Sequence, residues 1–249
     1  MDGERRLHIH TDPAALAHAA AARCIELARS AQAGHGTFHV ALAGGSTPRQ
    51  LYRLLATDYR ESIDWARTHV YFGDERCVAP DHPDSNYAMA HEALLRHVAI
   101  PPAQVHRIEA DDPDPRAAAR RYADLLQHRL PRPHAHATGC FDLVLLGLGP
   151  DGHIASLFPD TPILDEQRAW VAAVRVEKLS AWRISLTYPV LNAARHVALL
   201  VAGDGKAAVI RDVIATPGAA ARYPAGRLHP AGELEWFLDH AAARLLPGV

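Results

Sequence analysis

The apolar positions of this 249-residue chain fall into two kinds of segment. Six short runs are nearly continuous in apolar and β-branched residues, which is typical of strands covered on both faces. They are residues 37–43, 69–72, 141–147, 169–176, 183–187 and 196–201. The longer segments between them are rich in Ala, Leu and Arg, and the first places apolar residues at helical spacing. We expect helices at residues 13–32, 48–56, 86–97, 114–129, 205–214 and 232–245.

Strands that alternate with helices predict βαβ units. The expected fold class is therefore α/β: a doubly wound, mainly parallel sheet with helices on both faces, Rossmann-like and three-layered. The chain has no internal repeat and no long linker, and its length suits one large core, so we expect residues 1–249 to form a single α/β domain. An Asp- and Pro-rich loop at residues 110–115 could still join a small second lobe.

Composition and charge exclude several classes of partner. Apolar residues make up 49% of the chain and the formal net charge is -2, so no basic field invites nucleic acid. No apolar run reaches the length of a membrane span, and residues 1–10 lack the apolar segment of a signal peptide. The three cysteines, Cys24, Cys77 and Cys140, are an odd number and far apart, which argues against a disulfide framework. We therefore expect a cytoplasmic protein with neither a membrane nor a nucleic acid as partner.

The 17 histidines raise the question of a metal site. No H-E-x-x-H motif and no cysteine pair at zinc spacing occurs. His134 and His136 lie close together in a Pro-rich segment that we interpret as a solvated surface loop. We expect neither a metal nor a cofactor. Of the 26 basic residues only Lys178 and Lys206 are lysines, so a lysine beside a motif is more informative here than usual.

Ligands of doubly wound sheets bind at the carboxyl ends of the strands, so the loops that follow strands are searched first. Gly44, Gly45, Ser46 and Thr47 directly follow the first strand, and Pro48 comes next. Two glycines let backbone N–H groups approach a ligand, and the N-terminus of the following helix attracts anions. Ser46 or Thr47 can cap that helix. The loop lacks the ending of a Walker A motif, and is either a phosphate site or an ordinary strand-to-helix turn.

Two acids and an arginine, Asp74, Glu75 and Arg76, follow the strand at residues 69–72. They could form a surface ion cluster of little energetic value, or supply catalytic and sugar-binding groups at the mouth of a site. Arg76 offers a planar fork of donors for an anion or a developing oxyanion. Further along, Ser85 is interpreted as part of a turn and helix cap.

The loop after residues 141–147 carries the most information. Asp151 would repel a pyrophosphate and Pro150 lacks the N–H that a phosphate needs, so a dinucleotide site is disfavoured. The glycines nevertheless match G-x-G-x-x-G; they are Gly147, Gly149 and Gly152. Asp151 and His153 on such a turn suit acid–base chemistry, since histidine titrates near neutral pH and can accept a proton from water. The alternative is a capping or partly buried histidine.

Two further cations could complete an anion site. Lys206 stands near the start of a predicted helix, and Arg183 opens the strand at residues 183–187. Each alone is more often a solvated charge. Together with residues 44–47 they would form a phosphate site from backbone donors, hydroxyls and two cations.

These segments together resemble the glucosamine-6-phosphate isomerase/6-phosphogluconolactonase family. The shared segments cover most of the chain: residues 42–48, 72–76, 84–87, 147–153, 156–159, 183–187 and 203–206, with Pro230, Trp236 and Asp239 in the C-terminal part. Within the family, Arg76 after Asp-Glu and the lack of a carboxylate at residues 154–158 resemble the lactonases and not the deaminases. Ile154 departs from the lactonase pattern, in which Thr is usual, and could alter the packing behind His153.

The resemblance implies an enzyme of the oxidative pentose phosphate pathway that hydrolyses 6-phosphogluconolactone, as a monomer or small homo-oligomer. The implied binding residues for the substrate and its phosphate are Gly44, Gly45, Ser46, Thr47, Asp74, Arg183 and Lys206. The implied catalytic residues are His153 as general base, Arg76 as the group that stabilises the oxyanion or the product carboxylate, and Asp151. Asp151 would either orient the imidazole or bind a sugar hydroxyl. The alternatives are a deaminase/isomerase acting on an amino-sugar phosphate and a non-catalytic sugar-phosphate sensor.

Overall fold

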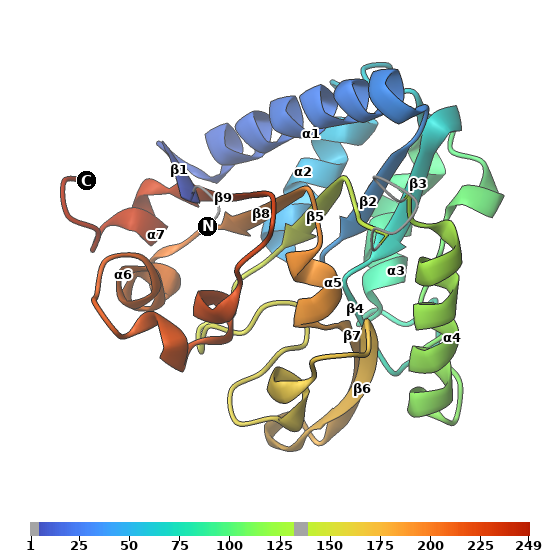
Figure 1. Ribbon diagram of the computed structural model, residues 1–249. Helices are drawn as coiled ribbons and strands as arrows, with labels where there is room; N and C mark the ends of the chain where they lie inside the picture. The colour runs from blue at the N-terminus through green and yellow to red at the C-terminus, as the bar shows by residue number, and fades with distance from the viewer. Residues whose placement is uncertain (1–4, 132–138) are drawn as a thin grey trace.

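The computed structural model describes residues 5–131 and 139–249. The predicted loop with His134 and His136 lies outside them. Six strands form the main sheet; they are β1 (Arg5–His10), β2 (Phe38–Leu42), β3 (Thr68–Phe72), β5 (Leu143–Leu146), β8 (His196–Val201) and β9 (Glu233–Asp239). Their order is β1-β9-β8-β5-β2-β3, and every neighbouring pair is parallel. The predicted α/β class with a mainly parallel sheet is confirmed (Figure 1).

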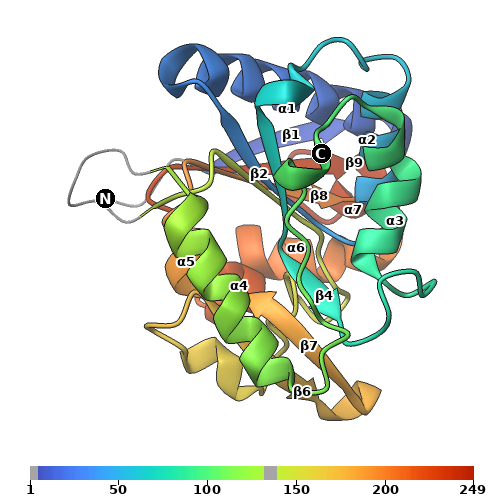
Figure 2. The ribbon, with the colours of Figure 1, turned by 90° about the vertical axis from the view of Figure 1, so that its right-hand side faces the viewer.

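Helices cover both faces of this sheet. α1 (Pro13–His35) and α2 (Ser46–Ala56) lie on one side, and α6 (Ala207–Ile214) lies on the other (Figures 1 and 2). β2 and β5 are consequently buried along their whole length. The remaining helices are α3 (Asn86–Ala93), α4 (Pro115–Arg129), α5 (Tyr188–Asn192) and α7 (His240–Ala243), with 3-10 helices η1 (Trp65–Arg67), η2 (Leu95–His97), η3 (Pro102–Gln104), η4 (Pro162–Asp165), η5 (Glu177–Leu179), η6 (Asp204–Lys206), η7 (Ala220–Arg222) and η8 (Pro224–Arg227). Within the described ranges, no helix is both long enough and apolar enough to cross a bilayer.

A second, smaller sheet is antiparallel. It consists of β4 (Asp74–Arg76), β7 (Ala181–Leu186) and β6 (Val171–Val176), in the order β4-β7-β6. The strands predicted at residues 169–176 and 183–187 therefore exist, but they do not join the parallel sheet. The connection between them is short, so they pair antiparallel with each other, because a parallel crossover needs a dozen or more residues. α4, which follows the loop at residues 110–115, packs on β6 and β7 (Figure 2).

The C-terminal prediction was wrong. Residues 232–245 were expected to form one helix, whereas residues 233–239 form β9 and only residues 240–243 are helical. β9 lies between β1 and β8, so its backbone groups are paired on both sides. Its apolar side chains Leu234, Trp236 and Leu238 are buried, and this tertiary burial outweighs the helical preference of the Ala- and Leu-rich segment that follows.

Gly73 joins the two sheets. It stands between β3 and β4, and its N–H donates to the carbonyl of Leu42 on β2 at 2.8 Å. Its own carbonyl accepts from the N–H of Leu186 on β7, also at 2.8 Å. One residue is thus bonded to a strand of each sheet.

The order of the parallel strands contains a switch point between β2 and β5. From β2 the chain continues outward to β3, whereas from β5 it continues to β8 and β9 on the opposite side. Ligands of such sheets bind in the crevice at the carboxyl ends of the two strands that flank the switch. Those ends carry residues 44–47 and 147–153.

Candidate active site

A cavity of about 510 Å³ opens at this switch point. All ten of the predicted site residues line it: Gly44, Gly45, Ser46, Thr47, Asp74, Arg76, Asp151, His153, Arg183 and Lys206. They come from the loops after β2 and β5, from β4 and β7 of the small sheet, and from η6. The structure therefore brings together residues that lie up to about 160 positions apart in the sequence.

The wall after β2 is the N-terminus of α2. Gly45 is the residue before the helix and has φ +106°, a left-handed conformation that favours glycine. Its neighbour Gly44 leaves room for Asn86, because a Cβ there would lie 1.9 Å from Oδ1 of that residue. The expectation that Ser46 or Thr47 caps the helix was wrong, since both lie inside its first turn and the N-terminus of α2 has no side-chain cap hydrogen bond. The first backbone N–H groups and the positive end of the helix dipole remain available for an anion.

Asp151 and His153 form a hydrogen-bonded pair after β5. Nδ1 of His153 lies 2.6 Å from Oδ1 of Asp151, and Nζ of Lys178 donates to Oδ2 of the same carboxylate. Burial raises the pKa of Asp151, but the hydrogen bonds from Lys178 and His153 outweigh it and lower the pKa to about 2. The ionised carboxylate can only accept, so Nδ1 carries a proton, and in the neutral imidazole the lone pair therefore lies on Nε2.

The glycines of this loop make space for the imidazole. A Cβ on Gly149 would lie 2.0 Å from Nδ1 of His153, and the N–H of Gly149 donates to the carbonyl of His153 at 2.8 Å. Gly152 has φ +77° and packs against Tyr223, whose ring a Cβ would approach to 2.5 Å. The ring of Phe158 covers one side of the imidazole, with the ring centroids 4.1 Å apart. The glycine spacing thus serves a tight turn around a histidine.

The acids of β4 have different surroundings. Asp74 accepts from Oγ of Ser156 at 2.6 Å and from Nδ2 of Asn86 at 3.1 Å, and it faces the cavity. Glu75 accepts instead from the backbone N–H groups of Asn86 and Tyr87 at the start of α3. Burial raises the pKa of Glu75, and its backbone hydrogen bonds oppose that rise. Glu75 therefore anchors α3, while Asp74 is the acid of this strand that a ligand in the cavity can reach.

Positive charge exceeds negative charge on the cavity wall. Arg76 and Arg183 stand opposite each other on β4 and β7, an arrangement of like charges that is unfavourable without an anion between them. Burial lowers the pKa of Arg183, and the charge of Arg76 lowers it further. Burial also lowers the pKa of Lys206, while the charge of Asp151 opposes this. With Lys178, four cationic side chains line the cavity against two carboxylates, so the cavity suits an anionic ligand.

Sequence reasoning missed four polar or aromatic lining residues: Asn86, Ser156, Phe158 and Lys178. The region around Asn86 was interpreted as a cap, and Ser85 does cap α3 by accepting from the N–H of Ala88. The rarity of lysine was a usable signal for Lys178, but its distance from the motifs hid it. Ile154, the departure from the lactonase pattern, is fully buried and belongs to the core.

A family model described as glucosamine-6-phosphate isomerases/6-phosphogluconolactonase matches residues 11–236. The chain belongs to this family. A family member named 6-phosphogluconolactonase from Streptomyces coelicolor is 39% identical over 254 aligned residues, which cover 99% of this chain and 97% of that one. The 6-phosphogluconolactonase of Synechocystis is 41% identical, with 87% of each chain covered. The solved structure of 6-phosphogluconolactonase from Trypanosoma brucei superposes with a TM-score of 0.82 at 28% identity, covering 98% of this chain and 99% of that one.

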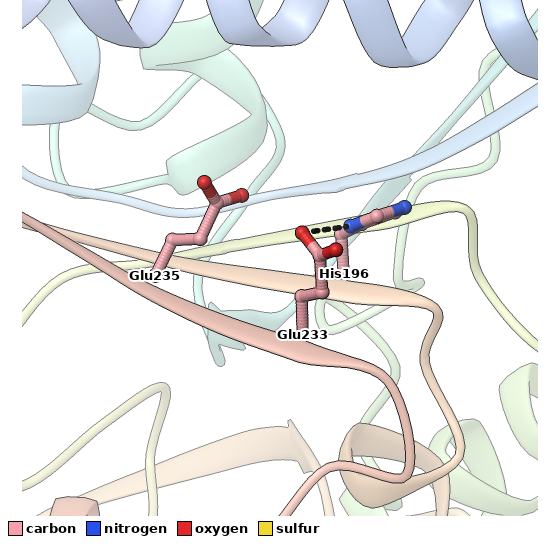
Figure 3. Close-up of side chains that lie close together, drawn as sticks. All are labelled: His196, Glu233 and Glu235. Atoms are coloured by element: carbon pink, nitrogen blue, oxygen red, sulfur yellow. Dashed lines mark ion pairs between the residues drawn. The ribbon is translucent and has the colours of Figure 1, made fainter. Parts of the chain in front are cut away.

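A cluster with metal-ligand side chains lies elsewhere in this family member. His196 opens β8, and Glu233 and Glu235 lie at the start of β9 (Figure 3). The cluster is therefore at the amino ends of these strands, and none of its residues lines the cavity. In the described ranges it is the one such group of three residues. Arg23 of α1 donates to Glu233 at 2.6 Å and to Glu235 at 2.9 Å. A guanidinium therefore already binds one oxygen of each carboxylate and supplies positive charge there, so we interpret the cluster as an ion-pair network.

Proposed function

We propose that the chain hydrolyses 6-phospho-D-glucono-1,5-lactone to 6-phospho-D-gluconate, a step of the oxidative pentose phosphate pathway. The observation that carries the proposal is the His153–Asp151 pair, placed with a free Nε2 on the wall of a cavity that has excess positive charge. Relatives named 6-phosphogluconolactonase that match nearly the whole chain support the same activity.

The substrate phosphate binds at the N-terminus of α2 in this proposal. Backbone N–H groups and hydroxyls of residues 44–47 surround it, and Arg183 and Lys206 neutralise its charge. Asp74, whose carboxylate faces the cavity, binds a sugar hydroxyl. Binding energy from the remote phosphate then holds the lactone carbonyl near His153 in a reactive orientation.

His153 acts as the general base at Nε2. It removes a proton from a water molecule, which attacks C1 of the lactone, and the negative charge that develops on the carbonyl oxygen is stabilised by Arg76. The C1–O bond of the ring then breaks, and the protonated imidazole returns its proton to the ring oxygen. Both oxygens of Asp151 already accept hydrogen bonds, which favours its role in orienting the imidazole over binding a sugar hydroxyl. A lactone is an activated ester, so the mechanism needs no covalent nucleophile, and none of the cavity serines lies in a G-x-S-x-G motif.

The enzyme works in this proposal as one α/β domain in the cytoplasm, as a monomer or small homo-oligomer. Cys24, Cys77 and Cys140 are free thiols, which suits a reducing compartment. The amino-sugar deaminase alternative lacks support, because residues 154–158 supply no carboxylate for proton transfer during ring opening and isomerisation.

The test is a pH-stat or coupled assay of freshly prepared 6-phosphogluconolactone, corrected for spontaneous ring opening, with and without chelator. The protein should accelerate ring opening to the same extent in both conditions. A rate equal to the spontaneous rate would reject the proposal. Release of ammonia from glucosamine 6-phosphate would show the deaminase activity instead.

A further inference from the structure

The two lysines of the chain both interact with one carboxylate, that of Asp151. Lys178 and Lys206 both line the cavity, although every other basic residue of the chain is an arginine. Lys178 donates a hydrogen bond to Asp151, and the charge of Asp151 also acts on Lys206. The mechanism above gives Lys206 a role at the phosphate but leaves Lys178 without one.

Lys178 reaches the site from the other sheet. It stands in η5, the turn that joins β6 to β7, and Ser180, which follows η5, has φ +48°. Its ammonium lies 4.7 Å from the centre of the Phe158 ring, within the range of a cation–π contact. The imidazole of His153 packs on the same ring. Phe158 and Asp151 therefore each contact both the ammonium and the imidazole.

We propose that Lys178 is a positioning residue for the lactonase reaction, which holds Asp151 from the β6–β7 turn so that Nδ1 of His153 keeps its hydrogen bond to this carboxylate and Nε2 stays free toward the cavity. The inference rests on the proposed function, because it assigns a task to Lys178 only if His153 is the base. An ammonium is suited to this task, since it is a compact charge on a flexible stem. An arginine could bind both oxygens of Asp151 and compete with the imidazole for the carboxylate.

The electrostatic effect has a definite sign. The carboxylate of Asp151 favours protonation of His153, and the positive charge of Lys178 on the same carboxylate opposes it. The other charged groups on the cavity wall are Asp74, Arg76, Arg183 and Lys206; they stay in place when Lys178 is changed. Removing the ammonium should therefore make the imidazole easier to protonate, and the general base should be lost at higher pH.

The first experiment measures kcat/KM against pH for three variants. In Lys178→Met the fall of kcat/KM at low pH should begin about 0.5–1 pH unit higher. This is the size expected when one positive charge is removed from a half-exposed site that is connected to the imidazole through Asp151. Lys178→Arg keeps the positive charge, so its acid limb should stay near the wild-type position, while kcat should fall because the guanidinium competes with the imidazole for Asp151. Arg175→Met is the matched control, because it removes an exposed positive charge from β6 of the same hairpin without touching the cavity. An acid limb that stays in place in Lys178→Met, whether or not KM rises, would overturn the proposal.

The second experiment does not depend on the substrate. The tautomer and titration of the His153 imidazole are followed by nitrogen NMR in the free protein, with His153→Gln used to assign the signal. The wild type should show a proton on Nδ1, and Lys178→Met should titrate at higher pH than the wild type. Coincident titration curves of the wild type and Lys178→Met would overturn the role of Lys178. If the curve of Lys178→Met is shifted but the wild type does not hydrolyse the lactone, only the proposed lactonase function is rejected.

Discussion

Gly149 is the position at which one added carbon atom tests the placement of the imidazole. A Cβ on this residue would lie 2.0 Å from Nδ1 and 2.2 Å from Cε1 of His153, and 2.7 Å from Oδ1 of Asp151. Gly149 is not one of the glycines with positive φ, so its backbone can accept alanine. The cost of Gly149→Ala therefore falls on the His153–Asp151 pair.

The size of the effect follows from these distances. Non-bonded heavy atoms pack at about 3.5 Å, so the ring must retreat by roughly 1.5 Å. A misplacement of about 1 Å near the chemistry can cost ~10²-fold in rate, and this movement also breaks the 2.6 Å hydrogen bond between Nδ1 and Oδ1. We expect Gly149→Ala to lower kcat by roughly 10²-fold. KM should change far less, because the residues proposed to bind the substrate phosphate lie on other segments.

The assay is steady-state hydrolysis of fresh lactone, with a thermal melt of the same sample to show that the fold is retained. Gly205→Ala is the matched control, since a Cβ there meets nothing within 4 Å and its φ is not positive. The control should keep the wild-type kcat. A Gly149→Ala enzyme with the wild-type kcat would refute the described position of the His153 ring.

Three further tests address the base, the anion site and the sheet. In the same assay, His153→Ala should lower kcat by roughly 10²–10⁴-fold, the range of a positioned general base. Lys206→Ala and Arg183→Ala should raise KM more than they lower kcat, because they remove charge from the phosphate site; an unchanged KM in both would reject that assignment. Burial, reinforced by the neighbouring His69, lowers the pKa of His39 on β2 to about 3. Below about pH 6.5 the unfolded chain therefore binds a proton that the folded chain does not, so the folded state loses stability as the pH is lowered. His39→Gln should lose about 2 kcal/mol less stability than the wild type between about pH 7 and pH 5 in urea unfolding; equal losses would count against the buried neutral imidazole.

Much of the cavity wall could be predicted because its residues follow strong local signals. A buried strand is recognisable from its apolar run, and the glycines and polar residues after it mark the loop at its carboxyl end. Residues 44–47 and 151–153 are of this kind, and they lie together because β2 and β5 are neighbours. Lys178 carries no such signal. Its contact with Asp151 depends on how the β6–β7 turn packs against a loop of the other sheet, which no local pattern specifies.

The strands that were missed or misassigned have a similar explanation. β1 is an edge strand, exposed in its first half and paired on one side with β9, so few of its positions need to be apolar. β9 leads directly into Ala- and Leu-rich residues, which favour a helix locally. Its strand character comes from pairing with β1 and β8, segments about 230 and 40 residues away in the sequence. Non-local pairing of this kind overrides local propensity.

Gly73 has a consequence for how a ligand affects the whole molecule. The cavity lies between the two sheets that Gly73 connects. α2 and the Asp151–His153 loop line it from the side of the parallel sheet, and Asp74, Arg76 and Arg183 line it from the small sheet. An anion bound from both sides would act as a non-covalent link between the two sheets. At about 100 times its Kd such a ligand adds roughly 2.7 kcal/mol to the stability of the bound fold. The gain should spread along the small sheet as slower amide hydrogen exchange in β6, a strand that contributes no residue to the cavity wall.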